Sequence, residues 1–244
     1  MQLSPASAIS PLALSQQLLS TLGTRVTYHH RAALPSGAGL MVVSNHRSIL
    51  DVPLVMMASR RPVRFACHHY MSRVPVLNEI VTGFGCLPLG AADDHQRSFF
   101  QQAVHLLKAQ QAIGIFPEGA QPMVELTPPD ETRTFHRGFA HLALRAPVEN
   151  LAILPIAIAS QQELTHSVFP LQLLSWFDPS EPLFNQAGWH PLVIYQQVDV
   201  VVGQPIWITP QHRQAYQGRQ ARSMVTELTS QCQAEIDRML RHGG

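Results

Sequence analysis

Short apolar runs alternate with segments of helical periodicity along most of the 244-residue chain. Apolar runs bounded by turn-forming residues indicate buried strands, and apolar residues that recur every three or four positions indicate helices. We expect strands at 39–43, 63–70, 85–89, 112–116, 151–159 and 192–202. We expect helices from Ser48 to about 60, at 76–84, 93–111, 138–145 and 211–241. This alternation predicts an α/β fold, with a mostly parallel or mixed sheet flanked by helices.

Local composition refines several of these elements. Pro88 favours an edge position or an early end for strand 85–89, because proline cannot donate to the ladder. The segment 151–159 is apolar throughout, which favours a central strand, although Pro155 interrupts it. The helix at 93–111 should bury one stripe of side chains. That stripe consists of Phe99, Phe100, Ala103, Val104, Leu106 and Leu107.

Three further segments complete the predicted organisation, a single domain with its core at about 39–210. The N-terminal part, 1–30, contains a weakly amphipathic stretch that either packs on the domain or lies in a membrane interface. The C-terminal part, 211–241, is predicted as one long polar helix. Segment 161–191 places Trp and Phe among prolines with little charge. It is either an interfacial or acyl-chain-binding flap, or a satellite apolar cluster under a long loop.

Low charge is the most unusual feature of the composition. Charged residues make up 14% of the chain, against an average of about 25%, which suggests that part of the surface faces something other than water. The net charge of +1 gives no general nucleic-acid footprint. No apolar run approaches the length of a transmembrane helix, and the N-terminus lacks the pattern of a signal peptide. We therefore expect a cytoplasmic protein that associates peripherally with a membrane.

The cysteines and histidines indicate no metal or disulfide chemistry. Cys67, Cys86 and Cys232 have no paired spacing, which favours reduced thiols in a cytosolic compartment. Cys67 is followed by His68 and His69 within an expected strand, but this cluster lacks the spacing of zinc ligands. We expect no metal site.

The stretch 44–51, Ser-Asn-His-Arg-Ser-Ile-Leu-Asp, contains the strongest pairing of a base with a carboxylate. It lies between a strand and a helix, where α/β proteins place functional residues. His46 can accept a proton near neutral pH, and Asp51 can orient the ring, as an aspartate does in serine proteases. On a continuous helix, five residues would separate the two side chains by roughly 140°. We therefore expect His46 in the loop and Asp51 in the first helical turn.

The segment from Ser48 to Asp51 also resembles a capping box, with Ser48 at the N-cap and Asp51 at N3. A carboxylate at a helix N-terminus is favoured in its ionised form, which an orienting group requires. The alternative is that Asp51 only caps the helix and that His46 is an ordinary loop histidine.

A second polar segment follows the expected strand at 112–116. Pro117 restricts one backbone angle and Gly119 frees another, so the amides of this turn can point at one spot and form an anion site. Glu118 then lies at the carboxyl end of a strand, where open sheets bind ligands. Pro-Glu-Gly alone is a common turn. Two polar segments that each follow a strand, however, predict one shared crevice.

Together these segments resemble the glycerolipid acyltransferases, the family typified by 1-acylglycerol-3-phosphate acyltransferase. Asn45, His46 and Asp51 match the Asn-His-x4-Asp motif of that family, and Phe116-Pro117-Glu118-Gly119 matches its Phe-Pro-Glu-Gly motif. The resemblance implies that the His-Asp pair is catalytic and that the second motif helps to bind the acyl acceptor.

Two further segments extend the resemblance. Phe135-His136-Arg137-Gly138 is similar to the Phe-Lys-x-Gly segment of the family, and Ile-Leu-Pro-Ile-Ala at 153–157 is similar to its Val-Pro-Val strand. Order and spacing agree from about 42 to 159, roughly half of the chain.

The resemblance implies transfer of a fatty acyl group from acyl-CoA or acyl carrier protein to a hydroxyl of a lysophosphatidate-like glycerolipid at a membrane surface. His46 would act as general base, and the hydroxyl oxygen would attack the thioester directly. The chain has no Gly-x-Ser-x-Gly elbow that would mark a serine nucleophile. No cofactor is implied beyond the thioester co-substrate. The implied substrate-binding residues are Asn45, Phe116, Pro117, Glu118, Gly119 and Arg137.

The chain departs from the family pattern at two expected phosphate-binding arginines. It has Pro-Leu-Gly-Ala-Ala at 88–92 and Glu-Gly-Ala-Gln at 118–121 where the family usually carries them. A phosphate monoester without a bidentate arginine loses a strong contact. The arginines that would substitute are Arg47, Arg133 and Arg137. Two alternatives follow: an acceptor without a phosphate monoester, such as another lipid alcohol or lysolipid, or a non-catalytic lipid-binding homologue.

Overall fold

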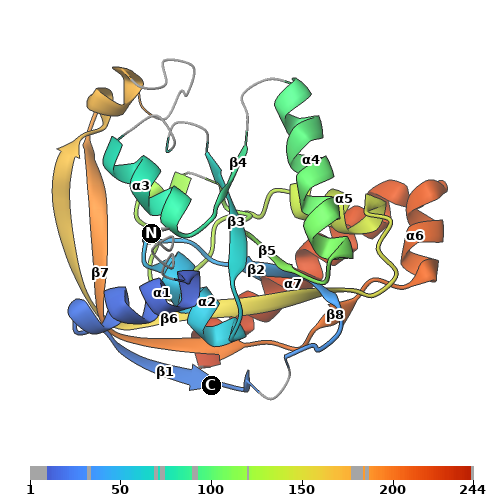
Figure 1. The fold of residues 1–244 in the computed structure, drawn as a ribbon, viewed down its shortest axis with the longest axis horizontal. Helices are drawn as coiled ribbons and strands as arrows, with labels where there is room; N and C mark the ends of the chain where they lie inside the picture. The colour runs from blue at the N-terminus through green and yellow to red at the C-terminus, as the bar shows by residue number, and fades with distance from the viewer. Residues whose placement is uncertain are drawn as a thin grey trace, which may run out of the picture.

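The structure is a computed structural model that describes residues 10–31, 34–68, 71, 75–89, 93–119, 121–176, 184 and 187–242. Its strands are β1 Arg25–His29, β2 Gly39–Ser44, β3 Val63–His68, β4 Leu87–Leu89, β5 Ala112–Ile115, β6 Leu151–Pro170, β7 Trp189–Val202 and β8 Ile206–Trp207. Its α-helices are α1 Pro11–Thr21, α2 Asp51–Ser59, α3 Pro75–Gly83, α4 Asp93–Lys108, α5 Gly138–Arg145, α6 Pro210–Gln217 and α7 Ala221–His242. Short 3₁₀ helices include η3 Gln121–Met123 and η4 Leu171–Trp176. Figure 1 shows their arrangement.

The strands form one mixed eight-stranded sheet in the order β1-β7-β6-β2-β5-β3-β4, with β8 paired to β6. β2 is parallel to both β5 and β6, whereas β7 and β8 are antiparallel to β6. The expected α/β fold is thus confirmed, and β4, which contains Pro88, lies at the edge as predicted. Because β2 and β5 are parallel neighbours, the segments 44–51 and 116–119 leave the sheet at the same edge.

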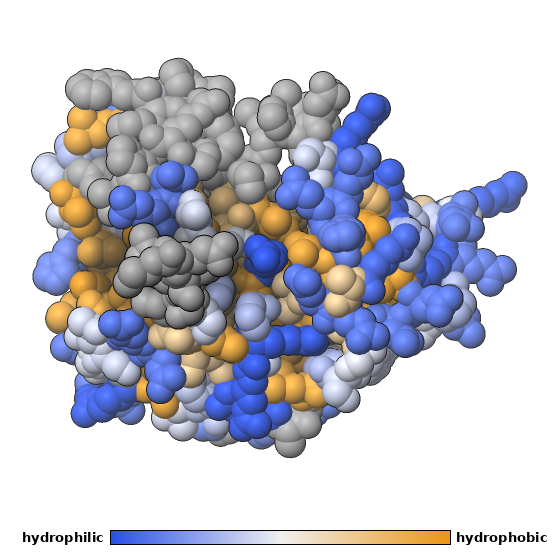
Figure 2. All heavy atoms as spheres, in the orientation of Figure 1, coloured by the Kyte–Doolittle hydropathy of each residue, from blue (hydrophilic) through white to orange (hydrophobic). Residues whose placement is uncertain are grey.

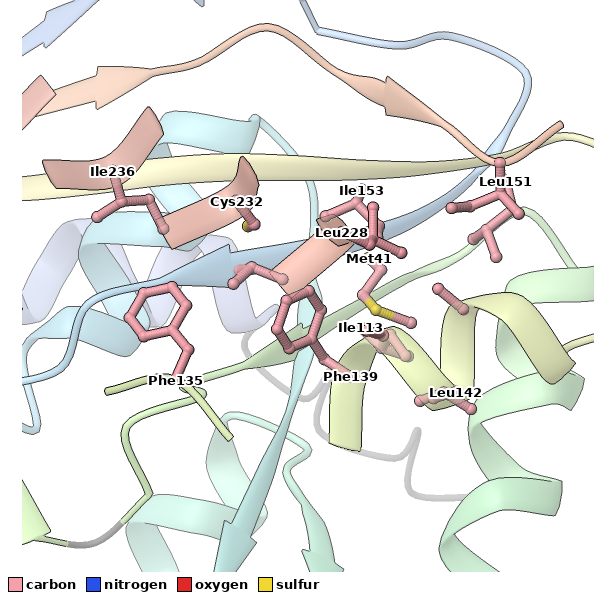
Figure 3. Close-up of a cluster of buried hydrophobic side chains, with 14 of the residues drawn as sticks. Met41, Ile113, Phe135, Phe139, Leu142, Leu151, Ile153, Leu228, Cys232 and Ile236 are labelled. Carbon is pink, nitrogen blue, oxygen red and sulfur yellow. The ribbon is translucent and has the colours of Figure 1, made fainter. Parts of the chain in front are cut away.

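Apolar side chains cover both faces of the sheet. In β2, Met41 and Val43 belong to one buried cluster, and Leu40 and Val42 belong to the other, as alternation along a strand requires. Helices α4, α5 and α7 cover the first face (Figure 3), and α1 and α2 cover the second. The stripe predicted on α4 packs into the first cluster. A central strand buried on both faces explains why the sequence of β2 is apolar without interruption.

The C-terminal helix differs from the prediction in two respects. It is divided into α6 and α7, and Gly218 is the C-cap of α6. It was also predicted as polar, but α7 buries one largely apolar face on the sheet (Figure 3). The buried residues of α7 are Val225, Leu228, Thr229, Cys232, Ile236, Met239 and Leu240.

Pro155 does not interrupt the central strand, contrary to expectation. β6 continues through it, and Pro155 lies opposite Val43 of β2. Its carbonyl accepts a hydrogen bond from Gly203 N at 2.9 Å, so the proline nitrogen faces the same side of the strand. On that side β7 has already ended and β8 has not yet begun. The missing donor therefore falls at a gap in the ladder, where it costs little.

The segment expected as a flap or long loop at 161–191 is largely a two-stranded ribbon. β6 extends to Pro170 and pairs antiparallel with β7 as far as Trp189. Register shifts between 160 and 163 and between 167 and 169 make the pairing irregular. Aromatic and β-branched residues favour strands, and the two described prolines of this segment, Pro170 and Pro191, lie near the far end of the ribbon. The parts of this prediction at 177–183 and 185–186 lie outside the described residues.

The edge strand β1 and the two-residue β8 were not predicted. The side chains of β1 are exposed or half-buried, so this strand carries no apolar run that would indicate it.

Before β1, α1 packs against α2, with Leu19 buried and Ser15 Oγ 3.6 Å from Met56 Sδ, which agrees with the first of the two alternatives for this segment. None of the helices in the described part of the chain is long and apolar enough to span a bilayer.

Candidate active site

His46 and Asp51 form a close pair where β2 leads into α2. His46 Nδ1 lies 2.8 Å from Asp51 Oδ2. Asp51 is the first residue of the helix and His46 lies in the preceding loop, as the five-residue spacing predicted. The side chain of His46 is 15% exposed and that of Asp51 only 1%. The imidazole is therefore the more accessible of the two side chains.

The start of the helix differs from the predicted capping box. α2 begins at Asp51, and its N-cap residue, Leu50, makes no side-chain cap. Asp51 Oδ2 accepts from Ser48 N at 2.8 Å, which is the carboxylate half of the box. The Ser48 hydroxyl instead accepts from Leu50 N and donates to the carbonyl of Val193 on β7 at 2.7 Å. The serine is thus used to fasten the loop to the neighbouring strand.

Four hydrogen bonds hold the Asp51 carboxylate. Besides the bonds from His46 and Ser48, Oδ2 accepts from Arg47 N at 2.7 Å, and Oδ1 accepts from the Tyr195 hydroxyl at 2.8 Å. Burial, and then the charge of Asp51, raise the pKa of Tyr195 well above its ordinary value. The phenol therefore remains a donor at physiological pH. All four groups suit an ionised carboxylate, which only accepts hydrogen bonds.

This pairing determines which nitrogen of His46 can act as a base. Since the carboxylate accepts, Nδ1 carries the proton that faces Asp51, and Nε2 keeps its lone pair. A hydroxyl placed at Nε2 can transfer its proton there while Asp51 stabilises the imidazolium.

An aromatic stack fixes the plane of the His46 ring. Phe116 lies parallel to the imidazole, with centroids 4.0 Å apart and planes at 9°, and Phe65 of β3 stacks on Phe116 at 4.7 Å and 15°. Gly114 makes room for this stack, because a Cβ at that position would come within 2.4 Å of the Phe65 ring. Phe116 thus contacts the His46 ring directly, and its predicted contact with a substrate stays a prediction.

Glu118 links the Phe-Pro-Glu-Gly turn to the loop of His46. Its carboxylate is buried, and its two oxygens accept from His46 N at 2.9 Å and Arg133 N at 2.7 Å. Burial raises the pKa of Glu118 above its ordinary value, although the two amides oppose this effect. Both carboxylate oxygens already accept hydrogen bonds from backbone amides. Contact between Glu118 and an acceptor therefore stays a prediction.

Gln233 of the C-terminal helix α7 fixes the backbone around Arg133, at the other end of this link. Gln233 Oε1 accepts from Phe135 N at 3.2 Å, and Gln233 Nε2 donates to Arg133 O and Thr132 Oγ1, each at 3.1 Å. Gln233 thus holds the backbone on both sides of the Arg133 amide that meets Glu118. A chain of hydrogen bonds therefore connects α7 to the backbone of His46.

Asn45, Pro117 and Gly119 also take part in holding the loops. The Asn45 amide exchanges two hydrogen bonds with the backbone of Ile158, at 2.8 and 3.0 Å, and so fastens the loop to β6. The Pro117 carbonyl accepts from His136 N at 2.8 Å. Gly119 has φ +73°, a conformation that favours glycine. Substrate contacts by these three residues stay predictions.

The three arginines considered for phosphate binding are placed differently. Arg47 is buried, and its guanidinium donates to both oxygens of Glu163, at 2.5 and 2.8 Å, and to the Thr127 carbonyl at 2.8 Å. Burial alone would lower the pKa of Arg47, but the bond to Glu163 and nearby negative charge outweigh it and leave the pKa raised. Arg133 donates to Thr127 Oγ1 at 3.2 Å. Arg137 is exposed and directly precedes α5.

Several residues that build this site were not predicted from the sequence. Tyr195, Glu163 and Gln233 each lie about a hundred residues or more from their partners in the chain. The one available signal was the alternation along β7, which places Tyr195 on the same face as Val193.

The described residues contain no group of three or more His, Cys, Asp or Glu side chains that could hold a metal ion. The three cysteines are free thiols.

Comparisons with known proteins identify the family and the fold of this chain. A family model described as Acyltransferase matches residues 25–159, more than half of the chain and a span that includes His46, Asp51 and the turn at 116–119. The fold is similar to that of the 1-acyl-sn-glycerophosphate (LPA) acyltransferase PlsC from Thermotoga maritima, with a TM-score of 0.60 and 16% identity over 95% of this chain and 77% of that chain. None of the curated proteins compared matches the sequence. The chain belongs to the acyltransferase family.

Proposed function

We propose that this protein transfers a fatty acyl group from a thioester, acyl-CoA or acyl carrier protein, to a hydroxyl of a lysophosphatidate-like glycerolipid. The observation that carries the proposal is the His46–Asp51 pair, with 2.8 Å between Nδ1 and Oδ2 and with Nε2 left for the acceptor. Membership of the acyltransferase family supports the reaction class. The similarity in fold to PlsC, a 1-acyl-sn-glycerophosphate (LPA) acyltransferase, supports a glycerolipid as the acceptor.

In this mechanism His46 Nε2 removes the proton from the acceptor hydroxyl as its oxygen attacks the thioester carbonyl carbon. The new carbon–oxygen bond forms, the carbon–sulfur bond breaks, and the departing sulfur takes the proton back from His46. Asp51 stabilises the imidazolium between the two proton transfers.

Direct attack is favoured over an acyl-enzyme because the serines that flank the pair are poorly suited to act as nucleophiles. Ser44 and Ser48 are both buried. The Ser48 hydroxyl already donates to the Val193 carbonyl at 2.7 Å, so it points at β7 and is not held by His46.

Arg137 is our candidate for contact with the phosphate of the acceptor. Arg47 and Arg133 donate to groups of the protein itself, whereas Arg137 is exposed. It follows His136, which is bonded to the Phe-Pro-Glu-Gly turn through the Pro117 carbonyl. A lysolipid or lipid alcohol without a phosphate monoester is the second candidate acceptor, and the commitment of Arg47 to Glu163 favours it.

The test measures acyl transfer by purified protein from labelled acyl-CoA and labelled acyl carrier protein. The acceptors are lysophosphatidate, glycerol-3-phosphate, other lysophospholipids and neutral lipid alcohols. We expect a labelled product with at least one acceptor, and we expect His46→Ala to lower the rate by about 10²–10⁴-fold. His141→Ala is the matched control, because His141 is exposed and bonded to Tyr216 on α6, and it should leave the rate unchanged.

The acceptor that reacts decides between the candidates. Acylation of lysophosphatidate supports a phosphate contact by residues such as Arg137. Acylation restricted to acceptors without a phosphate monoester supports the second candidate. Lipid binding without any transfer from either donor would overturn the catalytic proposal and leave a non-catalytic lipid-binding homologue.

A further inference from the structure

The ribbon formed by β6 and β7 beyond residue 162 has two different faces. On one face, Glu163 bonds to Arg47 and Tyr195 bonds to Asp51, so this face is turned toward the catalytic loop. Glu163 and Tyr195 are cross-strand partners. Side chains alternate along a strand, so the next pair along the ribbon, Leu164 and Ile194, is turned the other way.

Large apolar side chains are exposed on this ribbon and at its end. Leu164 is 44% exposed, Val168 47%, Leu173 of η4 39% and Trp189 56%. Figure 2 shows apolar side chains along the margin of the molecule where Figure 1 places the ribbon. Soluble monomers rarely gather exposed apolar groups in one place unless the surface has a partner.

The same part of the chain is poor in charge. Residues 164–198 include no Lys or Arg, and their only acidic residues are Asp178 and Glu181. An acidic carrier protein or an anionic headgroup binds chiefly through Lys and Arg side chains, and residues 164–198 include neither. Tryptophan beside aliphatic residues is instead typical of the boundary between lipid headgroups and acyl chains.

The ribbon leaves the sheet at the edge where the loop of His46 lies. β2 ends at Ser44, opposite Ile156 of the parallel strand β6, and the loop of His46 follows. β6 continues past this point to Pro170. The part from Glu163 onward alone spans about 23 Å if extended. Its apolar end therefore lies beyond the carboxyl edge of β2, the edge from which the loop of His46 emerges.

We propose that this protein docks on a lipid bilayer through the outward face and end of the β6–β7 ribbon, by insertion of Trp189, Leu173, Val168 and Leu164. The attachment is apolar, so it does not require anionic lipid and is not weakened by salt. The identity of the partner rests on the proposed function, because a lipid acceptor is held in a bilayer. The position of the surface rests on the exposure, charge and direction of the ribbon.

The first experiment is flotation of the full-length protein with vesicles of phosphatidylcholine and, separately, of phosphatidylglycerol. We expect similar binding to both, unchanged at high salt. Trp189→Ser should lower the partition coefficient about tenfold or more, the effect of losing one large buried apolar side chain. Trp207→Ser is the matched control. Trp207 is also exposed, at 45%, but lies on β8, which pairs near the opposite end of β6, so we expect no effect.

The second experiment uses tryptophan fluorescence. A variant in which Trp189 is the sole tryptophan (Trp176→Phe and Trp207→Phe) should shift to shorter wavelength on addition of phosphatidylcholine vesicles and should be quenched by brominated lipid. A variant that keeps only Trp207 should do neither. These measurements keep the Trp189 side chain, so they report its insertion even if Trp189→Ser proves too unstable for the flotation experiment.

Three results would overturn the docking proposal. The first is binding by Trp189→Ser equal to wild type. The second is binding that needs phosphatidylglycerol or disappears in salt. The third is an oligomer, seen by sedimentation, that Trp189→Ser converts to monomer without a change in vesicle binding, which would make the ribbon an interface between copies of the chain.

Failure of the proposed function gives a different result. If no donor and acceptor react, but flotation still depends on Trp189, the docking surface stands and the catalytic role falls. If both hold, Trp189→Ser should lower turnover of acceptor presented in vesicles while leaving turnover of a dispersed short-chain acceptor near wild type.

Discussion

At the scale of single residues, the carboxylate of Asp51 is the most constrained group in the site. It accepts from two backbone amides, from the imidazole of His46 and from the Tyr195 hydroxyl. The amides place it, and the phenol shares its negative charge with the imidazole. We therefore propose that Tyr195 is a positioning residue, which acts on the reaction through Asp51.

Removal of the Tyr195 hydroxyl tests this role. Tyr195→Phe keeps the buried ring but leaves more of the Asp51 charge to stabilise the imidazolium of His46. We therefore expect the acid limb of the pH profile of kcat/KM to move toward higher pH. The stability cost should be about 1–3 kcal/mol, measured by urea unfolding.

Tyr216→Phe provides the control for this measurement, because its hydroxyl bonds to His141 outside the site. That variant should keep the wild-type pH profile. A profile that does not move in Tyr195→Phe would show that the phenol serves packing alone.

At the scale of elements, neighbouring strands position the His46 ring through stacked aromatic side chains. β3 contributes Phe65, and Phe116 directly follows β5. The stack from Phe65 through Phe116 to His46 is possible because Gly114 of β5 has no side chain. The strand order β2-β5-β3 thus orients the imidazole as well as bringing the two motifs together.

Gly114→Ala should disturb this arrangement. A Cβ would lie 2.4 Å from the Phe65 ring, so Phe65 must move and the stack must tilt. We expect a loss of about 1–3 kcal/mol in the free energy of unfolding, as for other overpacked cores, together with lower kcat. Thermal unfolding and acyl-transfer assays measure the two effects.

Gly138→Ala is the matched variant at the start of α5, where an added Cβ would meet nothing within 4 Å. Alanine is the better helix former, so its stability should equal or slightly exceed that of wild type. Wild-type activity in Gly114→Ala would contradict a role for the stack in orienting His46.

At the scale of the whole molecule, the ion pair between Arg47 and Glu163 joins the loop of His46 to the ribbon. Arg47 is 4% exposed and Glu163 20%, and the pair is bidentate. It connects the loop at 44–51 with β6, the strand that we propose leads to the membrane. Loss of Glu163 would leave a buried guanidinium without its main partner.

We expect Glu163→Gln to lower the free energy of unfolding at neutral pH by about 1–3 kcal/mol, less than for a fully buried pair because Glu163 is partly exposed. Burial alone would raise the pKa of Glu163, but the bond to Arg47 outweighs it and holds the pKa below its ordinary value of 4.5. A group with a lowered pKa contributes stability above its unfolded-state pKa and loses it as the pH falls through the folded-state pKa. The difference between wild type and variant should therefore shrink below pH 4.5.

Denaturant unfolding at a series of pH values measures this difference. Glu125→Gln is the control, since Glu125 pairs with Arg133 at the surface and is 44% exposed. That variant should change stability little at any pH. A deficit in Glu163→Gln that stays constant through acid pH would mean that the charge of Glu163 contributes nothing.

The sequence by itself determined those features that depend on neighbours in the chain. Uninterrupted apolarity indicated β2 and β5, helical periodicity indicated α5 at Gly138–Arg145, and Pro88 indicated the edge strand. The five-residue spacing of His46 and Asp51 was enough to predict a loop residue paired with the first turn of a helix. These are short-range properties of backbone geometry, so no knowledge of the remaining fold was needed.

The tertiary structure alone decided the features that depend on distant segments. Tyr195, Glu163 and Gln233 reach the site from β7, β6 and α7, and nothing local to these residues indicates their partners. Packing likewise drew the Ser48 hydroxyl away from its expected cap and placed Pro155 at a gap in the ladder. The physical reason is common to all of them. A buried polar group must find a hydrogen-bond partner, and which partner is within reach depends on strand order and register, to which residues throughout the chain contribute.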